Sequence, residues 1–485
     1  MFNKTIPPLP SWRTIFKAFF SAKPEDKILA KPWLLRKSDK PYLFSRSAVS
    51  LYMIVQWWIK YTNKKNPVIW IPDYFCNESL VLLRQLDCIF HFYQVNEHFK
   101  PNWDYCIDNI DIQKPDIFLL VHYFGIPSDG KLAREFCDKQ NCILVEDAAH
   151  VLIPSGSIGN HGEFTFYSPH KLIAIPDGSV LIHRPKTKVL RMLSEKDSVI
   201  IMNEVCHSYK YTSPSPWIWI MKRIIQKLFP DVLWKKQKKI NIEKIPSPNF
   251  KVIKNNQSTM GKKFLAAQNN QINGYSLTRK INQSILNILC NHKNFQKNEH
   301  IPYLAFFYCD RYQDEYFNLL KDKKYPVMKW PDLPPEVSEN PAKHAVAIKL
   351  EKNLLFLPVH QSMRVRDLKK IAIFISGNVI KSPTIENFQL ECYNGREELW
   401  NAYLTSVSKP NLMQTWPYGE AKSEVEGWDI YRGIIKKDAN IVAIFQALKK
   451  SWGPFKIIRI NRGPLLISKE DELINRYNIY KLIRG

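Results

Sequence analysis

The sequence predicts an α/β fold with a mostly parallel sheet, and three observations support this class. Short apolar runs closed by turn residues, typical of buried parallel strands, occur at residues 68–75, 116–125 and 142–150. The stretches between them carry leucines and phenylalanines at helical spacing. At 485 residues, 45 % of them hydrophobic, the chain is long enough for a large core and more than one domain.

Two helices are expected between these strands. Leucines three residues apart predict a helix over 77–86. Leu132 and Phe136, four residues apart, predict the buried face of a second helix over 130–141. Alternating strands and helices form parallel sheets with short connections, so these segments should build one α/β domain.

Ligands of such sheets bind beyond the carboxyl ends of the strands, where Glu146, Asp147 and His150 stand. A further strand at 163–168 leads to Lys171, which follows Asp147 by 24 residues (171 − 147). A lysine and a carboxylate at this edge have two interpretations. They form a buried ion pair, or they are the fixed points of a pyridoxal phosphate (PLP) site. PLP needs a lysine whose amine binds its aldehyde carbon covalently, and a carboxylate that keeps its ring nitrogen protonated.

A candidate phosphate site precedes this region. Ser45 and Ser47 stand at the start of a predicted helix whose apolar positions are Val49, Met53 and Trp57. Hydroxyls and free backbone N–H groups at a helix N-terminus bind phosphate. The spacing is compatible with PLP but leaves both interpretations of Lys171 open.

Residues 186–255 have a different character, with Trp217 to Leu228 forming an apolar stripe among lysines and arginines. One interpretation is an amphipathic helix on an anionic membrane surface. The favoured alternative is an insertion whose apolar face packs on its own domain or on a second subunit. An α+β segment over 302–375 and a linker from 376 follow, and strands are expected at 430–448, with a turn at 438–440, and at 457–467.

Composition narrows the function classes. The formal charge of +25 suits nucleic acid, an anionic membrane or anionic small molecules, but no RNA- or DNA-binding signature occurs, which disfavours nucleic acid. Nine cysteines without a C-x-x-C pair argue against a disulfide framework and against a zinc site. The N-terminus lacks an apolar signal core, and the run at 51–59 is too short to span a bilayer. The sequence thus predicts a cytoplasmic protein without a metal.

Residues 32–375 resemble the DegT/DnrJ/EryC1/StrS family of sugar aminotransferases, which have the PLP-dependent transferase fold type I. The matching motifs occur in the family's order: FSRSAVSLY, IPDYFCNES, LLVHYFGIPSD, VEDAAH, FTFYSPHKLIAIPDGSVL and LLFLPVHQSMRVRDLKKI. The sequence departs from the family where Arg46 replaces a glycine, where His150 replaces a glutamine, and where IPDGS at 175–179 replaces a glycine pair. The resemblance implies a large domain with a mostly parallel sheet and a small α+β domain.

The resemblance also implies a role for each matching residue. Lys171 would bind PLP covalently, and Asp147 would pair with its ring nitrogen. His150 would lie near the phenolic oxygen of the cofactor. The remaining candidates would hold the phosphate (Ser45, Ser47 and Ser168) or stack on the ring (Tyr74 or Phe75).

The implied activity is a ping-pong transamination from an amino acid, glutamate in most relatives, to a keto sugar linked to a nucleotide, for surface polysaccharide or amino-sugar biosynthesis. Family members are homodimers with active sites at the subunit interface. The alternative is a non-catalytic scaffold or sensor that keeps the fold and binds a nucleotide sugar or a membrane surface. A dehydratase on this fold is disfavoured, because those relatives replace the lysine with histidine and this chain keeps Lys171.

A second resemblance covers residues 399–485, which are similar to the opening of a FemAB-like acyltransferase domain with the GNAT fold. The matching residues are Gln414, Trp416, Lys422, Gly427, Trp428, Arg462, Gly463 and Pro464. The segment lacks the part of that fold that binds the acyl donor, so no acyl transfer is expected from it alone. The predicted organisation is an N-terminal extension (1–31), a large domain (32–185), an insertion (186–255), a small domain (256–378), a linker (379–398) and this partial domain (399–485).

Overall fold

A computed structural model describes residues 5–22, 24–185, 195–208, 216–229, 256–290, 300–309, 313–378, 388–407, 410–437, 440–452 and 455–467. The chain divides into two compact units, residues 1–287 with 292–372, and residues 288–291 with 373–485. Most of the predicted insertion, residues 379–387 of the predicted linker, most of the turn at 438–440, and the segment 468–485 lie outside the described residues.

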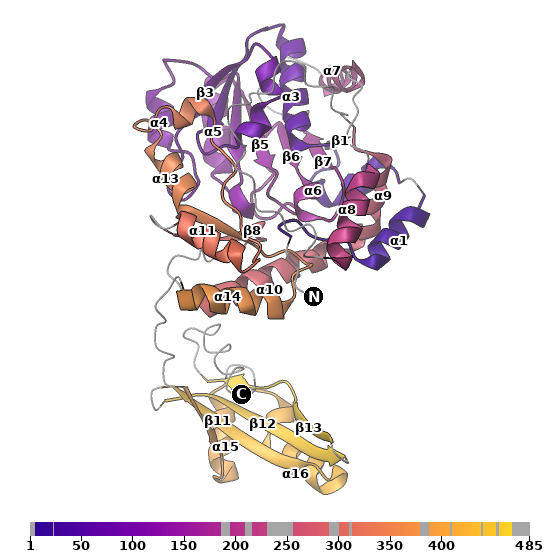
Figure 1. The fold of residues 1–485 in the computed structure, drawn as a ribbon, viewed down its shortest axis with the longest axis vertical. Helices are drawn as coiled ribbons and strands as arrows, with labels where there is room; N and C mark the ends of the chain where they lie inside the picture. Colours follow the sequence, from indigo (N-terminus) through magenta and orange to yellow (C-terminus); the bar gives the residue numbers. More distant parts are fainter. Residues whose placement is uncertain are drawn as a thin grey trace. The chain divides into compact units, whose positions relative to one another are not determined.

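A seven-stranded sheet forms the centre of the first unit (Figure 1). Its strands are β1 (Lys40–Phe44), β2 (Val68–Pro72), β3 (Ile89–Tyr93), β4 (Ile117–Val121), β5 (Ile143–Ala148), β6 (Phe164–Tyr167) and β7 (Ser179–His183). Their order is β1-β7-β6-β5-β4-β2-β3, and only β7 pairs antiparallel with its neighbours β1 and β6. The predicted α/β fold with a mostly parallel sheet is therefore confirmed.

Helices α3 (Ser47–Thr62), α4 (Trp103–Asp108), α5 (Gly130–Gln140) and α7 (Glu195–Ser208) accompany this sheet, and α6 (Pro169–Leu172) follows β6. The large side chains of Trp57, Trp70 and Phe118 are fully buried in the core that they share with the strands. The predicted buried face of α5 is wrong at Leu132, which is 48 % exposed, and right at Phe136.

The predicted α-helix over 77–86 is also wrong. The segment forms two short 3₁₀ turns, η2 (Asn77–Leu80) and η3 (Leu83–Gln85). Leu80 and Leu83 are nonetheless fully buried. A 3₁₀ helix has three residues per turn, so side chains three apart share a face as they do in an α-helix. The leucine spacing indicated burial correctly and could not separate the two helix types.

The rest of the first unit is mostly helical around a small hairpin. The elements are α1 (Trp12–Phe20), α2 (Asp26–Ala30), α8 (Pro216–Leu228), α9 (Thr259–Gln268), α10 (Ile272–Cys290), β8 (Leu304–Tyr308), α11 (Gln313–Asp322), α12 (Pro335–Ser338), α13 (Ala345–Asn353), β9 (Leu354–Pro358) and α14 (Val365–Asn378). Strands β8 and β9 pair antiparallel, as the α+β prediction for 302–375 expects. Residues 376–378, predicted as linker, belong to the last turn of α14.

The N-terminal segment is tied to residues far along the chain. The Ser362 hydroxyl accepts a hydrogen bond from the Leu9 amide (3.0 Å) and donates one to the Leu9 carbonyl (2.9 Å). The His360 ring bonds the Thr5 carbonyl at 3.0 Å. Residues 5–9 therefore form a fixed strap on the first unit.

The second unit is an antiparallel sheet with two helices. Its strands are β10 (Phe388–Cys392), β11 (Asp429–Lys437), β12 (Asn440–Trp452), β13 (Phe455–Ile460) and β14 (Leu465–Leu466), and its helices are α15 (Glu397–Thr405) and α16 (Trp416–Glu426). The order is β10-β11-β12-β13, with β14 paired to β12. The predicted strands at 430–448 are confirmed by β11 and β12, while the predicted strand at 457–467 is two strands, β13 and β14, separated by residues 461–464. The linker prediction is wrong at 388–392, because these residues pair with β11 as β10.

Among the described residues, no helix is both long and apolar enough to cross a membrane.

Candidate active site

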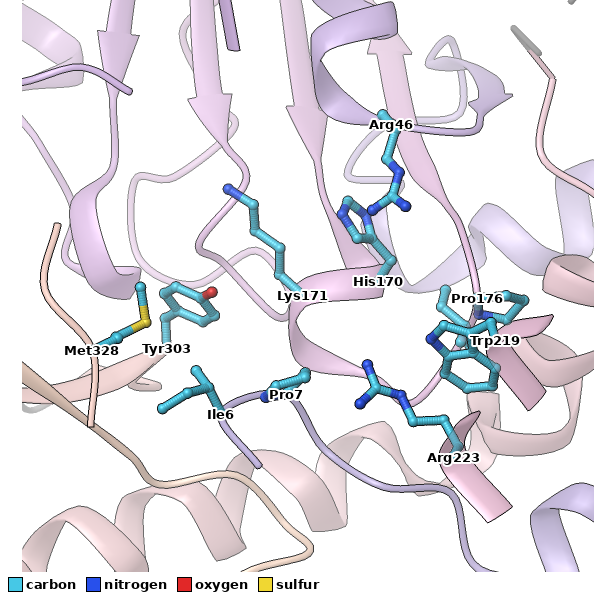
Figure 2. A pocket seen from close by; sticks show the side chains of 11 residues that line it. Ile6, Pro7, Arg46, His170, Lys171, Pro176, Trp219, Arg223, Tyr303 and Met328 are labelled. Atoms are coloured by element: carbon cyan, nitrogen blue, oxygen red, sulfur yellow. The ribbon is translucent and has the colours of Figure 1, made fainter. Parts of the chain in front are cut away.

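A cavity of about 410 Å³ lies in the first unit next to the short helix α6 (Figure 2). Three of its lining residues are basic and come from the sheet side: Arg46 from the residue before α3, and His170 and Lys171 from α6. Figure 2 shows the Lys171 amine with Tyr303 on one side and with His170 and Arg46 on the other. The cavity thus brings the predicted lysine to the edge where the strands end.

Lys171 and Asp147 meet at this edge without forming an ion pair. The Lys171 amine contacts the His150 ring, with 3.4 Å between Nζ and Nε2. Asp147 is buried and accepts one hydrogen bond, from the Ala149 amide to Oδ1 (2.8 Å). Burial raises the pKa of Asp147, while the Lys171 charge lowers it in part. The structure therefore rules out the buried ion pair and keeps a carboxylate within the field of the lysine.

His150 is held between two aromatic rings. It stacks on Tyr303 at 4.5 Å and on Phe124 at 5.6 Å between ring centroids. The Phe124 amide donates to Nδ1 at 3.4 Å, and the other ring nitrogen, Nε2, faces the Lys171 amine. Burial, and secondly the Lys171 charge, hold the pKa of His150 well below its usual range. His150 therefore presents a neutral ring to the lysine.

The backbone at Phe124 is adapted to this contact. Its φ of 56° lies in the left-handed region, which an aromatic residue rarely adopts. The next residue, Gly125, has φ 90°, and a Cβ there would lie 2.1 Å from the Ile301 carbonyl oxygen. Strain of this kind persists where the surrounding structure enforces it, often at functional sites.

The other end of the cavity has the features of an anion site. Helix α3 begins at Ser47 without a side-chain cap from Arg46, and a helix N-terminus of this kind can bind an anion. Figure 2 shows the Arg46 guanidinium beside the His170 ring. Burial lowers the pKa of Arg46, and the Asp177 and Glu78 charges raise it in part. A guanidinium at a helix N-terminus suits a phosphate.

His170 is fixed by the unusual Pro-Asp-Gly turn. Its Nδ1 lies 2.9 Å from the Gly178 carbonyl and 3.0 Å from the Ser168 hydroxyl. Asp177 in turn accepts hydrogen bonds from the amide and the hydroxyl of Ser258 at the start of α9. Gly178 has φ 151°, and a Cβ there would meet the Gln257 side chain at 2.6 Å. The turn that replaces the family's glycine pair thus connects the lysine segment to α9.

The predicted serines have different positions. Ser47 is the first residue of α3, next to the anion site. Ser45 is buried, and its carbonyl accepts a hydrogen bond from the Gly178 amide. Ser168 is fully buried behind His170 and does not line the cavity.

The predicted ring-stacking residues also lie away from the cavity lining. Tyr74 is fully buried and stacks on Trp330 at 4.4 Å, while Phe75 packs in the same core. Tyr303, which no sequence motif indicated, stacks on His150 and lines the cavity. It lies more than a hundred residues after Lys171, and nothing in its local sequence marks it.

Glu146, the other carboxylate at the end of β5, has a structural role. It accepts hydrogen bonds from the His122 ring (2.9 Å) and from the amides of Gly159, His161 and Gly162. Burial raises its pKa, but these donors outweigh burial and lower the pKa of Glu146 to about 2. Each oxygen already has two donors, so Glu146 has no capacity left for a ligand.

The backbone after Lys171 is held by side chains of the helical part. The Leu172 carbonyl accepts hydrogen bonds from Arg279 (2.8 Å) and from Gln361 (3.0 Å). Arg279 also donates to the Pro302 and Tyr303 carbonyls. One buried guanidinium therefore positions both α6 and the segment that carries Tyr303.

The remaining wall comes from the N-terminal extension and from the predicted insertion. Ile6 and Pro7 of the strap line the cavity, and so do Trp219 and Arg223 of α8. Figure 2 shows the Arg223 guanidinium turned toward the cavity. Burial lowers the pKa of Arg223 to about 10, and its buried Nε has no hydrogen-bond partner among the described residues. The i, i+4 spacing of Trp219 and Arg223 was the one available signal that they share a helix face.

The C-terminal motif residues Gln414 and Trp416 make packing and hydrogen-bond contacts within the second unit. The Gln414 side chain is buried and bonds the backbone of Gln446 and the Asn461 carbonyl. The Arg432 guanidinium lies over the Trp416 ring, 3.5 Å from its centroid. These contacts stabilise the sheet, and the acyltransferase resemblance of this unit stays a prediction.

Solved structures with a similar fold include three informative ones. Streptococcus pneumoniae Spr1654, assigned as a sugar aminotransferase and solved in its PMP form, has a TM-score of 0.58 and 14 % identity over 77 % of this chain and 98 % of its own. DesI, solved in the presence of its TDP-sugar product, has a TM-score of 0.57 and 12 % identity over 79 % and 93 %. Helicobacter pylori PseC, an aminotransferase of pseudoaminic acid biosynthesis, has a TM-score of 0.56 and 10 % identity over 79 % and 100 %.

No family model and no curated protein matches the sequence. At identities of 10–14 % the structural likeness establishes architecture. These neighbours are matched over 93–100 % of their own length. The chain thus has the fold of the PLP-dependent sugar aminotransferases.

Proposed function

We propose that this chain is a PLP-dependent aminotransferase that moves an amino group from glutamate to a keto sugar carried by a nucleotide. The observation that carries this proposal is the position of Lys171. Lys171 lines the cavity together with Arg46 at the start of α3, its amine contacts His150, and its charge acts on the buried Asp147. The shared fold with sugar aminotransferases supports the same conclusion.

The donor set fits PLP. Lys171 would hold its aldehyde carbon, Asp147 its ring nitrogen, and Arg46 with the first amides of α3 its phosphate. When bound, PLP supplies a ring that takes up electrons from the carbon that gains or loses the amino group. The raised pKa of Asp147 shows how costly its burial is, which a positively charged partner on the ring side would offset.

The chain itself supplies positioning and proton transfer. The Lys171 amine is the basic group next to the reacting carbon and is suited to move the proton there. His150 contacts this amine through Nε2 at 3.4 Å and is itself held by stacking on Tyr303. Arg279 and Gln361 fix the backbone on which the lysine stands.

Arg223 is the candidate residue for substrate charge. It enters the cavity from α8, away from the anion site of Arg46, and its Nε lacks a partner. A buried guanidinium without full pairing gains strongly from a carboxylate or a phosphate. We therefore assign to Arg223 the anionic group of the amino donor or of the nucleotide.

Several wider expectations belong to the same proposal. The homodimer, the cytoplasmic location, the role in surface polysaccharide biosynthesis and the division into six segments follow from the family resemblance. The C-terminal unit would be a partial FemAB-like domain without acyl transfer of its own. Their support is the resemblance of the quoted motifs.

The direct test uses the purified full-length chain with added PLP. PLP bound covalently to a lysine absorbs visible light, and this band should appear in the wild type and change when glutamate is added. Lys171→Ala should lose the band. Its rate of 2-oxoglutarate formation should fall by at least about 10³-fold. The matched control is Lys131→Ala, since Lys131 is exposed on α5 and does not line the cavity.

A wild-type protein that stays colourless with PLP would overturn the proposal in favour of a scaffold that only keeps the fold. A band that persists in Lys171→Ala would move the covalent site elsewhere. If the wild type forms the band but aminates no nucleotide-linked keto sugar, the cofactor assignment would stand and the proposed substrate would be wrong.

A further inference from the structure

Helices α1 and α8 share one exposed aromatic surface. Phe19 of α1 stacks near Trp217 of α8 at 5.5 Å between ring centroids. Lys227 of α8 donates to the Pro10 carbonyl at 3.0 Å, and its amine lies 5.3 Å from the Trp12 ring centroid. Figure 1 shows α1, α8 and α9 gathered at one side of the first unit. The two helices, far apart in the sequence, therefore form one continuous patch.

The inner faces of both helices are used for packing. Ile15 and Ala18 of α1 and Ile220 of α8 are buried in a cluster that includes Phe264 of α9. Trp219 packs edge-on against Phe264 at 5.6 Å. The apolar residues on the outer faces therefore contribute little to this core.

Those outer residues are large and apolar. Six of them are between 50 % and 76 % exposed: Trp12, Phe16, Phe20, Trp217, Ile218 and Met221. In α1 the three aromatic side chains recur every four residues and so form one stripe. Such a contiguous exposed patch marks an interaction site in a folded protein. We call these six residues the α1–α8 patch.

The charged residues of helices α1 and α8 have one sign. Helix α1 carries Arg13 and Lys17, and α8 carries Lys222, Arg223 and Lys227, while neither helix contains an acidic residue. Arg13, Lys17 and Lys222 are exposed. Aromatic side chains with flanking lysines and arginines are the composition of helices that lie in the headgroup region of anionic bilayers.

We propose that the α1–α8 patch binds the surface of an anionic membrane. A second copy of the chain suits the patch less well, because a two-fold contact would bring its cations together and like charges repel. A lipid surface accepts the aromatic side chains in its interface and pairs the cations with its phosphates. This inference uses the outer faces of α1 and α8 only and does not depend on the reaction proposed above.

The test measures binding of the full-length chain to vesicles in a sedimentation assay. The protein should sediment with phosphatidylcholine vesicles that contain about one third phosphatidylglycerol. Pure phosphatidylcholine vesicles should bind at least about tenfold less protein. Phe16→Ser with Ile218→Ser should lower binding roughly tenfold or more, because two large apolar side chains no longer enter the interface. Lys17→Glu with Lys222→Glu should do the same and remove the salt dependence.

The matched control is Ile107→Ser with Ile112→Ser, two exposed isoleucines outside the α1–α8 patch, which should leave binding unchanged. Circular dichroism of each variant checks that it is folded. Equal binding to neutral and anionic vesicles, or undiminished binding of the Phe16 and Ile218 variant, would overturn the inference. So would a dimer, seen by light scattering without vesicles, that the same two substitutions dissociate.

Discussion

Glu146 and Asp147 are neighbours on β5, yet their side chains lie in two different regions of the molecule. Successive residues of a strand point to opposite faces, so one carboxylate faces the loop at 159–162 and the other lies within the field of Lys171. Glu146 receives four hydrogen bonds and Asp147 receives one. Burial is common to both carboxylates, while the number of donors from the chain separates the structural one from the one that is left for a ligand.

The largest effect is expected for Glu146→Gln. The amide nitrogen of glutamine would face N–H donors wherever it is placed, and the charge that holds them would be gone. Removing one partner from a buried charged network costs about 3–5 kcal/mol. Unfolding in urea should show this loss, with Asp147→Asn as the isosteric control on the adjacent residue.

An unchanged free energy of unfolding for Glu146→Gln would show that the loop at 159–162 does not depend on this carboxylate. The distinction between the two carboxylates would then fail on its structural side.

A smaller effect, now on catalysis, is expected for Asp147→Asn. The Ala149 amide keeps its acceptor, so stability should change by less than about 1 kcal/mol. Under the proposed function, kcat/KM should fall by about 10²-fold or more, because an uncharged amide cannot keep the ring nitrogen protonated. The visible band should persist, since Lys171 is intact. An activity equal to that of the wild type would remove Asp147 from the site.

The smallest effect concerns acid and a third buried group, His183. Burial, and secondly Arg184, lower its pKa to about 3, while the unfolded chain binds a proton near the ordinary value. The unfolded state therefore gains stability as the pH falls below about 6.5, and the native state does not. Between about pH 7 and about pH 5.5 the wild type should lose about 1 kcal/mol more stability than His183→Gln.

The measurement is urea unfolding of both proteins at the two pH values. His183→Gln also loses stability at neutral pH, through its stacking on Phe164, but this loss is the same at both and cancels. An equal drop in the two proteins would mean that His183 is protonated in the native state.

The sequence predicted the strands and the helix start on the sheet side of the candidate site well. Asp147, His150 and Lys171 stand at the carboxyl ends of strands that periodicity identifies, and parallel pairing brings such ends to one edge. The start of helix α3 was predicted from the helical spacing of the apolar residues that follow it. Local pattern and general topology are sufficient where the functional residues belong to regular elements.

The opposite wall could not be predicted, because tertiary packing alone determines it. Ile6 and Arg223 reach the cavity from segments that are more than 200 residues apart, and Tyr303 depends on a buried arginine that holds its backbone. Ser168 looked equivalent to Ser47 in the sequence, but a single hydrogen bond to His170 occupies its hydroxyl. Side-chain direction at the end of a strand is set by such contacts and not by spacing.

The strap of residues 5–9 has a consequence for the order of events during synthesis. Its partners His360 and Ser362 follow it by 355 and 353 positions, so a ribosome must finish almost the whole first unit before they exist. Until then the cavity lacks the wall that Ile6 and Pro7 provide. The nascent chain can assemble the sheet and expose Lys171 early, but the closed cavity is a late product of folding.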